Sequence, residues 1–341
     1  MPPQSDKVRV AILGASSLRG KDLKECLAEG RIRGLEIRLF DEEFAAGTLT
    51  EAAGEAAVIK LVDEESFNDT RFVFLTGSPE FAGLHWRAAS NAGATVIDVS
   101  GSLAAEPDAI PWIPALNSAQ TFQTESGASR EAKNLFLVPS APADIAISIH
   151  SAFASRELEL LVFTFFQPVS EHGLEGIEEL EGQVAKLLSL APIPQAVFDT
   201  QVAFNMLSEY GEESGGKLRD VRAHIQTEVR RYLGRSVRIP VIAVVHAPVF
   251  HANAFTAYAQ FKPRVGLDEI TELLVNAGLK VSGLDEQPPT NVSVAGESRP
   301  VLGHPEYEAG NERGIWLWGA ADNLRVPSAT AVAIAEALLA R

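Results

Sequence analysis

The stretch Val8-Arg9-Val10-Ala11-Ile12-Leu13-Gly14-Ala15-Ser16-Ser17-Leu18-Arg19-Gly20 decides the fold of this chain of 341 residues. Its first six residues are mostly apolar and rich in β-branched side chains, which predicts a strand buried on both faces, as in a parallel sheet. The strand ends at Gly14, and after a turn through two serines the chain continues into a predicted helix over 21–29. A strand, a tight turn and a helix N-terminus present backbone N–H groups and a positive dipole end to a phosphate.

This turn carries an incomplete glycine pattern for dinucleotide binding. In the form G-x-x-G-x-x-G, Gly14 and Gly20 occupy the outer positions and Ser17 stands in the middle one. We interpret the turn as a nucleotide loop to which Gly14, Ser16, Ser17 and Leu18 contribute. The alternative is a strand, turn and helix that only pack against one another.

An acidic residue ends the second predicted strand, which covers 35–41. Asp41 follows Gly20 by 21 residues, near the spacing at which a carboxylate binds the adenosine ribose hydroxyls. With Glu42 and Glu43 beside it, Asp41 would repel a 2′-phosphate, so the sequence favours NAD over NADP as the cofactor. The alternative is an acidic surface turn.

Strands and helices alternate along the first part of the chain. Buried strands are predicted over 72–75, 94–99 and 134–138, and helices over 81–92 and 145–153. This alternation predicts a parallel sheet with right-handed crossovers, and ligands collect at the carboxyl ends of such strands. Thr76 and Gly77 form a turn at one of these ends, where the backbone can approach a ligand closely.

From about residue 139 the pattern changes to longer strands. Strands are predicted over 157–168, 237–250 and 254–261. Residues 226–233 belong to a predicted helix, and a further helix is predicted from a cap at Ser328 to Leu339. Without β-α-β alternation, this part indicates an α+β domain on a mostly antiparallel sheet. We therefore predict an α/β chain with a dinucleotide-binding domain over 1–138, completed by a C-terminal helix within 323–341. A substrate and dimerisation domain is predicted over 139–322.

Composition and charge exclude several classes of protein. The net charge is −16 and no basic run occurs, so neither nucleic acid nor an anionic membrane is an expected partner. The sequence shows no signal-peptide pattern and no stretch long enough to cross a membrane, which predicts a cytoplasmic protein. The single cysteine, Cys26, excludes cysteine-based metal clusters and shares a helix face with Leu23 and Leu27. We interpret Cys26 as a core residue, with a reactive thiol as the alternative.

Taken in order, the motifs resemble those of the aspartate-semialdehyde dehydrogenase family over nearly the whole chain. GASSLRG at 14–20 resembles that family's GATGAVG cofactor loop, and QPVSEHGLEG at 167–176 resembles its QAVSGAGKAG segment. Further landmarks match at Phe204-Asn205, at a helix ending near Leu233, at Ala247-Pro248-Val249-Phe250 and at Asp322-Asn323-Leu324-Arg325. The resemblance implies a Rossmann-like cofactor domain, a catalytic domain that also forms a homodimer, and NAD or NADP contacts at Gly173 and Asn323.

The residues that carry the family's chemistry are replaced in this chain. The family reduces an acyl phosphate to an aldehyde with NADPH through a cysteine thioester, which needs a thiolate, a histidine to move its proton, and arginines for carboxylate and phosphate. At the matching positions the chain has Ala141 for the cysteine, Asn253 for the histidine, His246 and Ala104 for the arginines, and Gln167 unchanged.

Other matching positions also differ, and the sequence offers no replacement triad. The arginine and serine that read the 2′-phosphate fall on Phe44 and Ala45, and an acid and a lysine of a later helix fall on Val221 and His224. His246 and His251 are interpreted as packing or surface histidines.

Three functional hypotheses follow from these replacements. The preferred one is a homologue without the family's activity, with a binding or regulatory role. The alternatives are an active NAD(P)-dependent semialdehyde dehydrogenase in amino-acid biosynthesis from aspartate, or a reductase with an altered substrate.

Overall fold

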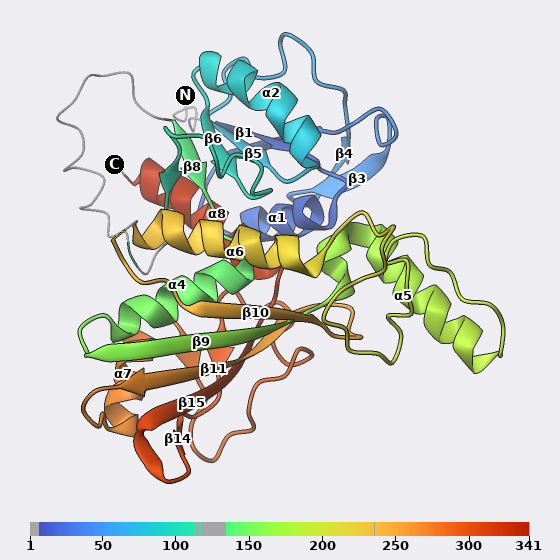
Figure 1. The fold of residues 1–341 in the computed structure, drawn as a ribbon. Coiled ribbons are helices and arrows are strands. Elements are labelled where there is room, and N and C mark those ends of the chain that lie inside the picture. Colours follow the sequence, from blue (N-terminus) through green and yellow to red (C-terminus); the bar gives the residue numbers. More distant parts are fainter. Residues whose placement is uncertain (1–6, 114–115, 117–133, 235, 341) are drawn as a thin grey trace. The chain divides into compact units, whose positions relative to one another are not determined.

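The computed structural model describes residues 7–113, 116, 134–234 and 236–340 (Figure 1). The chain forms two compact units, one made of Met1–Pro139 and Pro327–Arg341 and the other of Ser140–Val326. None of the helices in the described ranges is long and apolar enough to cross a membrane.

The first unit contains the predicted parallel sheet. Its strands follow the order β2-β1-β5-β6-β8-β7, and all of its strand pairs are parallel. The strands are β1 (Val8–Leu13), β2 (Leu35–Phe40), β5 (Phe72–Leu75), β6 (Thr95–Asp98), β7 (Ile110–Pro111) and β8 (Leu135–Leu137). All residues of β5 and β6 are buried, as expected where helices cover both faces of a sheet.

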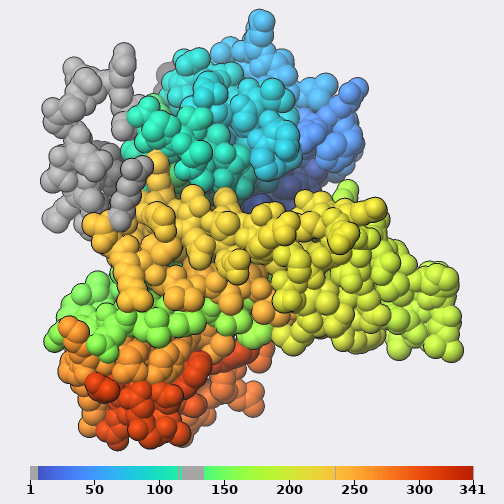
Figure 2. All heavy atoms as spheres, in the orientation of Figure 1, coloured from blue at the N-terminus to red at the C-terminus, as the bar shows by residue number. Residues whose placement is uncertain are grey.

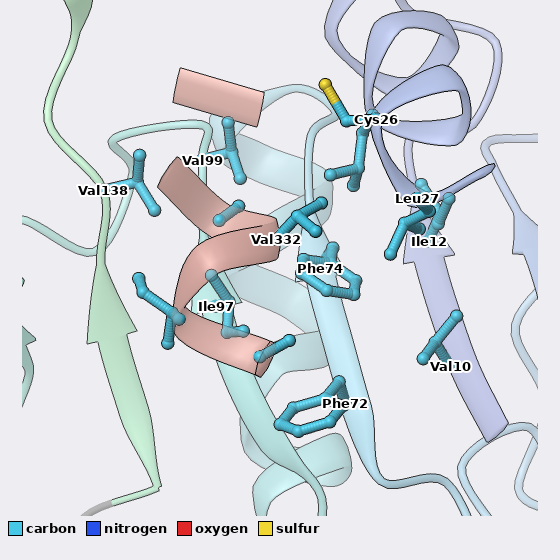
Figure 3. Close-up of a cluster of buried hydrophobic side chains, with 14 of the residues drawn as sticks. Val10, Ile12, Cys26, Leu27, Phe72, Phe74, Ile97, Val99, Val138 and Val332 are labelled. Carbon is cyan, nitrogen blue, oxygen red and sulfur yellow. The ribbon is translucent and has the colours of Figure 1, made fainter. Parts of the chain in front are cut away.

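Helices α1 (Leu18–Glu29), α2 (Pro79–Asn91) and α8 (Arg325–Leu339) complete this unit. One core cluster joins Ile12 of β1, Leu27 of α1 and Val332 of α8 (Figure 3). Cys26 belongs to the same cluster and is 7% exposed, which confirms its interpretation as a core residue. A second cluster, which includes Leu75 and Phe81, covers the other face of the sheet. A small hairpin of β3 (Leu49–Ala52) and β4 (Glu55–Val58) was not expected from the sequence.

The second unit contains a mixed sheet in the order β10-β9-β11-β15-β13-β12, with β14 paired to β15. Its strands are β9 (Leu158–Gln167), β10 (Val241–His246), β11 (Asn253–Phe261), β12 (Lys280–Val281), β13 (Val301–Leu302), β14 (Glu306–Glu308) and β15 (Asn311–Ala321). The pairs β9–β10 and β12–β13 are parallel and the others are antiparallel. The predicted fold class, a Rossmann-like sheet plus a mostly antiparallel α+β domain, is confirmed.

The helical elements of this unit are α4 (Ala141–Phe153), η1 (Val169–His172), α5 (Gly173–Leu188), α6 (Leu218–Leu233) and α7 (Leu267–Asn276). Helix α4 packs on β9 and α6 on β10 (Figure 1). Phe163, Phe165 and Phe255 are buried on the face of the sheet that forms the core. On the opposite face, Trp316 and Trp318 are 45% and 40% exposed.

This second face continues over the neighbouring strands, since residues alternate between the two faces of a strand. We call it the open sheet face, and its half-buried or exposed members include Leu160, Val162, Thr164, Phe166, Thr256, Tyr258, Trp316 and Trp318.

Several predicted boundaries were wrong, each for a local reason. The strand expected over 237–250 covers only Val241–His246, since Pro240 and Pro248 flank it and lack the N–H of a sheet ladder. Helix α8 begins at Arg325 and not after Ser328, since the Asp322 carboxylate accepts the N–H groups of Leu324 and Arg325, both at 3.0 Å. Asp322 is thus the cap of α8.

Three other helices begin earlier than expected, one of them α2, which was predicted from 81 and begins at Pro79. Helix α4 was predicted from 145 and begins at Ala141, with Pro142 in its first turn, a position that proline favours. Helix α1 was predicted from 21 and begins at Leu18, directly after its cap, Ser17.

Candidate cofactor loop and catalytic-site positions

The glycines of the nucleotide loop are required by close approach of backbone to backbone. Gly14 has φ +89°, and a Cβ there would lie 2.1 Å from the nitrogen of Gly77. A Cβ on Gly20 would lie 2.3 Å from the carbonyl oxygen of Gly14. The loops after β1 and β5 therefore meet at a distance that only glycine permits.

Ser17, in the place of the middle glycine, fits this turn. Its Oγ accepts the N–H of Gly20 at 2.9 Å and so caps α1. The same Oγ lies 2.7 Å from the carbonyl oxygen of Gly14 and 2.9 Å from that of Thr76. The hydroxyl thus connects the turn to the loop after β5. The first turn of α1, which includes Leu18, directs its backbone N–H groups toward the N-terminal end of the helix.

Asp41 lies against this loop at the end of β2. It is 4% exposed, and its two carboxylate oxygens accept the N–H groups of Ser16 at 2.7 Å and of Glu42 at 2.9 Å. Each oxygen keeps a second lone pair with which it could accept a ribose hydroxyl. Phe44 and Ala45, at the positions of the 2′-phosphate-reading pair, carry no charge; Phe44 is 79% exposed and Ala45 is buried. The residues present therefore fit a nicotinamide dinucleotide.

In the second unit, the sheet register brings three of the predicted catalytic positions into one row. His246 pairs with Gln167 across β10 and β9. Ala254 of β11 pairs with Phe166 of β9, which places Asn253 beside Gln167. His246, Gln167 and Asn253 are 0%, 3% and 1% exposed and lie on the core face. We call these three side chains the polar row.

His246 is enclosed by a cluster of rings. Its Nδ1 lies 3.3 Å from the Tyr210 hydroxyl and its Nε2 lies 3.4 Å from the carbonyl oxygen of Val202. The rings of His172 and Phe198 also belong to this cluster. Burial lowers the pKa of His246, and burial together with repulsion from His246 lowers the pKa of His172 to about 4. Both imidazoles are thus neutral at pH 7.

His246 is buried and His251 is exposed at the surface. The interpretation of both as packing or surface histidines stays a prediction. A neutral, enclosed imidazole cannot provide the fixed charge and forked donors of an arginine.

Asn253 begins β11 at the end of the polar row. Its Oδ1 is buried and has no hydrogen-bond partner among the described residues. A side-chain amide does not exchange a proton near neutral pH, so Asn253 lacks the acid–base chemistry of a histidine. The preceding Ala252 has φ +70°, a left-handed conformation in which side chains are uncommon.

Asn323 holds this turn in place. Its Oδ1 accepts the N–H of Ala252 at 2.9 Å, and its Nδ2 lies 3.1 Å from both Ser170 Oγ and Glu171 Oε1. Asn323 is 2% exposed, and its amide connects the backbone at Ala252 with the side chains of Ser170 and Glu171 within the second unit. Gly173 directly follows η1, which contains Ser170 and Glu171, and has φ +70° and open space where a Cβ would be. Their cofactor contacts stay predictions.

Ala141 is the first residue of α4 and is 1% exposed. The other end of α4 packs Phe153 against Phe261, with ring centroids 5.2 Å apart. Because Phe261 ends β11 and Asn253 begins it, the Ala141 end of the helix lies toward the polar row (Figure 1). Ala104 lies in the turn after β6, in the first unit.

A carboxylate that the sequence analysis missed lies beside Ala141. Glu228 of α6 accepts the N–H of Ser140 at 2.9 Å and the Ser140 hydroxyl at 2.5 Å. The outer side of α6 forms part of the surface of the second unit (Figure 2), while Glu228 is only 5% exposed. His224, one turn earlier, lies 3.7 Å from Glu228. A serine bonded directly to a carboxylate differs from a triad, in which an imidazole stands between them.

Asp144, one turn into α4, gives the unit a pH-dependent stability. Burial raises the pKa of its carboxyl to about 6, and the Ser148 hydroxyl, 2.9 Å away, opposes that rise only in part. The folded protein binds this proton more tightly than the unfolded chain, so the group favours folding at acidic pH and loses that effect as pH rises through 6. We expect Asp144→Asn to raise the free energy of unfolding at pH 7 by up to about 3 kcal/mol.

Urea unfolding at pH 4.5 and 7 would measure this effect. The difference between Asp144→Asn and the unmodified chain should grow between the two pH values. Asp268→Asn, which removes an exposed acid from the first turn of α7, serves as the control and should give a small difference that does not depend on pH. Equal pH profiles for the two variants would contradict the prediction.

Comparison with known proteins assigns the class. Residues 151–326 match the family model of the semialdehyde dehydrogenase dimerisation domain, and residues 9–124 match that of the semialdehyde dehydrogenase NAD binding domain. The chain therefore belongs to the semialdehyde dehydrogenase family. Among the described residues, no group of three or more histidine, cysteine, aspartate or glutamate side chains is arranged to hold a metal ion.

Its relatives place the chain among aspartate-semialdehyde dehydrogenase homologues. It is 28% identical to a USG-1 protein homolog of Pseudomonas aeruginosa and 26% identical to aspartate-semialdehyde dehydrogenase 2 of Vibrio cholerae, each over 98% of both chains. The structure of a probable aspartate-semialdehyde dehydrogenase from Pseudomonas aeruginosa matches with a TM-score of 0.85 at 28% identity, over 98% of both chains. Aspartate semialdehyde dehydrogenase II of Vibrio cholerae, solved in complex with ASA, shares the fold with a TM-score of 0.84 at 24% identity, over 98% of this chain and 99% of that one.

Proposed function

We propose that this protein is an NAD-binding homologue of aspartate-semialdehyde dehydrogenase that lacks the family's activity and has a binding or regulatory role. The observation that carries the proposal is the polar row. At the positions where the resemblance puts an arginine and an acid–base histidine, the row has the neutral, enclosed His246 and the amide of Asn253.

The surroundings of the row also disfavour an anionic substrate. Burial, followed by the charges of Glu171 and Glu209, raises the pKa of the Tyr210 hydroxyl, which lies 3.3 Å from His246 Nδ1. An acyl phosphate that carries a carboxylate would need charge-assisted contacts here, and a neutral imidazole does not supply them. Without a thiol at Ala141, no thioester forms there.

The dinucleotide loop supports the binding part of the proposal. The N–H groups in the first turn of α1 would hold the pyrophosphate, and Asp41 would accept the adenosine ribose hydroxyls. When bound, NAD would supply a hydride acceptor. The orientation of Asp41 is fixed by two backbone N–H groups, so its charge stays where a 2′-phosphate would lie.

We expect NAD to bind at least about tenfold more tightly than NADP, because a 2′-phosphate would meet the Asp41 carboxylate. Calorimetric titration of the purified chain with each nucleotide would measure the two dissociation constants. Tighter binding of NADP would contradict the cofactor preference, and the absence of binding by either nucleotide would contradict the binding role.

A further inference from the structure

A side-chain hydrogen bond joins the two loops that flank the glycine loop. The Ser78 hydroxyl, in the loop after β5, donates to Glu42 Oε1, in the loop after β2, at 2.8 Å. The strand order β2-β1-β5 puts β1 between these loops. Neighbouring strands are about 4.8 Å apart, so the two loops that this bond joins follow strands about 10 Å apart, on either side of β1.

Both partners of this bond are held in position from their own loops. Ser78 caps α2, and its Oγ accepts the N–H of Phe81 at 3.2 Å, which directs its hydroxyl hydrogen away from the helix and toward Glu42. The N–H of Glu42 donates to Asp41 Oδ1 at 2.9 Å. The carboxylates of Asp41 and Glu42 therefore lie on the same edge of the sheet, one against the glycine loop and the other across it.

Building on the NAD site proposed above, we infer that Glu42 is a second specificity-determining residue for the nucleotide, and that Ser78 is its positioning residue. A dinucleotide with its pyrophosphate at α1 and its ribose at Asp41 lies along this edge. The hydrogen bond from Ser78 holds the Glu42 carboxylate at this edge of the sheet, so the side chain does not extend into solvent. A phosphate on that ribose then meets two carboxylates, whereas the uncharged ribose of NAD meets two hydrogen-bond acceptors.

The test compares the dissociation constants of NAD and NADP for matched variants, measured by calorimetry at low ionic strength, where charge repulsion is least screened. Glu42→Gln keeps an acceptor oxygen for Ser78 and removes the charge, so NADP should bind about tenfold more tightly while NAD changes less than about threefold. Glu43→Gln removes the same charge from an exposed neighbour that Ser78 does not hold in place, and it should change the NADP constant much less than Glu42→Gln does.

Two Ser78 variants test the positioning role. Ser78→Ala should raise NADP affinity about threefold by releasing Glu42, and circular dichroism would show whether α2 stays folded without its cap. Ser78→Thr keeps the hydroxyl and should behave like the unmodified chain.

The outcomes separate this inference from the proposed function. An NADP-to-NAD ratio that changes equally in Glu42→Gln and Glu43→Gln would overturn the inference and leave the NAD preference of the unmodified chain in place. An unchanged NADP-to-NAD ratio in Glu42→Gln would also overturn the inference and leave the NAD preference of the unmodified chain in place. Binding of neither nucleotide to any variant would overturn both.

Discussion

Turnover of aspartate semialdehyde with NADP and phosphate is expected to be at least about 10⁴-fold slower with this protein than with an ordinary member of the family. In the proposed assignment, Ala141, Asn253 and His246 stand where the family resemblance puts the nucleophile, the acid–base group and a substrate anchor. Residues that act as one catalytic unit cause losses of this size when one is removed. Absorbance of NADPH at saturating substrate would measure the rate. Turnover within tenfold of an ordinary dehydrogenase would mean that the catalytic positions have been assigned to the wrong residues.

Restoring the thiol alone is expected to fail. In Ala141→Cys, the sulfur would lie next to the Ser140–Glu228 pair, whose carboxylate disfavours a thiolate, and it would have no histidine partner. Adding Asn253→His should leave KM very high until His246→Arg restores a charge-assisted contact to the substrate carboxylate. Ala141→Ser is the matched control, and thiol labelling would show that the cysteine variant carries two thiols.

A single arginine on the open sheet face is expected to convert the protein from dimer to monomer. The chain carries the family's dimerisation domain, and the open sheet face has the exposed apolar character of an interface. Thr164 lies within this face and pairs with Thr256 of the neighbouring strand. Thr164→Arg would bury an unpaired charge between two copies, which costs several kcal/mol.

Sedimentation equilibrium at micromolar concentration would measure the change. The unmodified chain should have twice its chain mass of 36.6 kDa, and Thr164→Arg should have the mass of one chain. Val275→Arg adds the same charge at a half-exposed position of α7, on the side of the sheet where the helices pack, and should stay dimeric. A dimeric and folded Thr164→Arg would place the interface elsewhere.

The parallel sheet could be predicted because each of its buried strands is visible in the sequence as a run of apolar residues. A strand buried on both faces, such as Phe72–Leu75, needs a continuous apolar run, and such a run is visible in the sequence. The hairpin of β3 and β4 contains both polar and apolar residues, most of them exposed. Neither the spacing of its apolar residues nor its composition therefore distinguishes it from a loop. The start of α8 depends on Asp322, whose capping role becomes visible only once its hydrogen bonds are known.

The site could be predicted only where its requirements are local. Gly14 has a left-handed backbone conformation, and Gly20 lies against the carbonyl oxygen of Gly14 within the same short turn, so the sequence pattern indicates both glycines directly. Glu228 contacts Ser140 across 88 residues of chain, and no spacing rule connects a helix start with the side of another helix. The rings of Phe198 and Tyr210, which enclose His246, lie in a segment without helical or strand periodicity, so their position depends on tertiary packing alone.

The register that forms the polar row has an evolutionary consequence. The backbone hydrogen bonds of β9, β10 and β11 align Gln167, His246 and Asn253 whatever side chains these positions carry. Buried phenylalanines such as Phe165 and Phe255, further along the strands, stabilise the same alignment without taking part in chemistry. A lineage can therefore lose an enzyme's activity by a few neutral replacements while keeping a folded protein that selection can adapt to another ligand. The reverse path is much harder, because each reversion confers no advantage until the others are present.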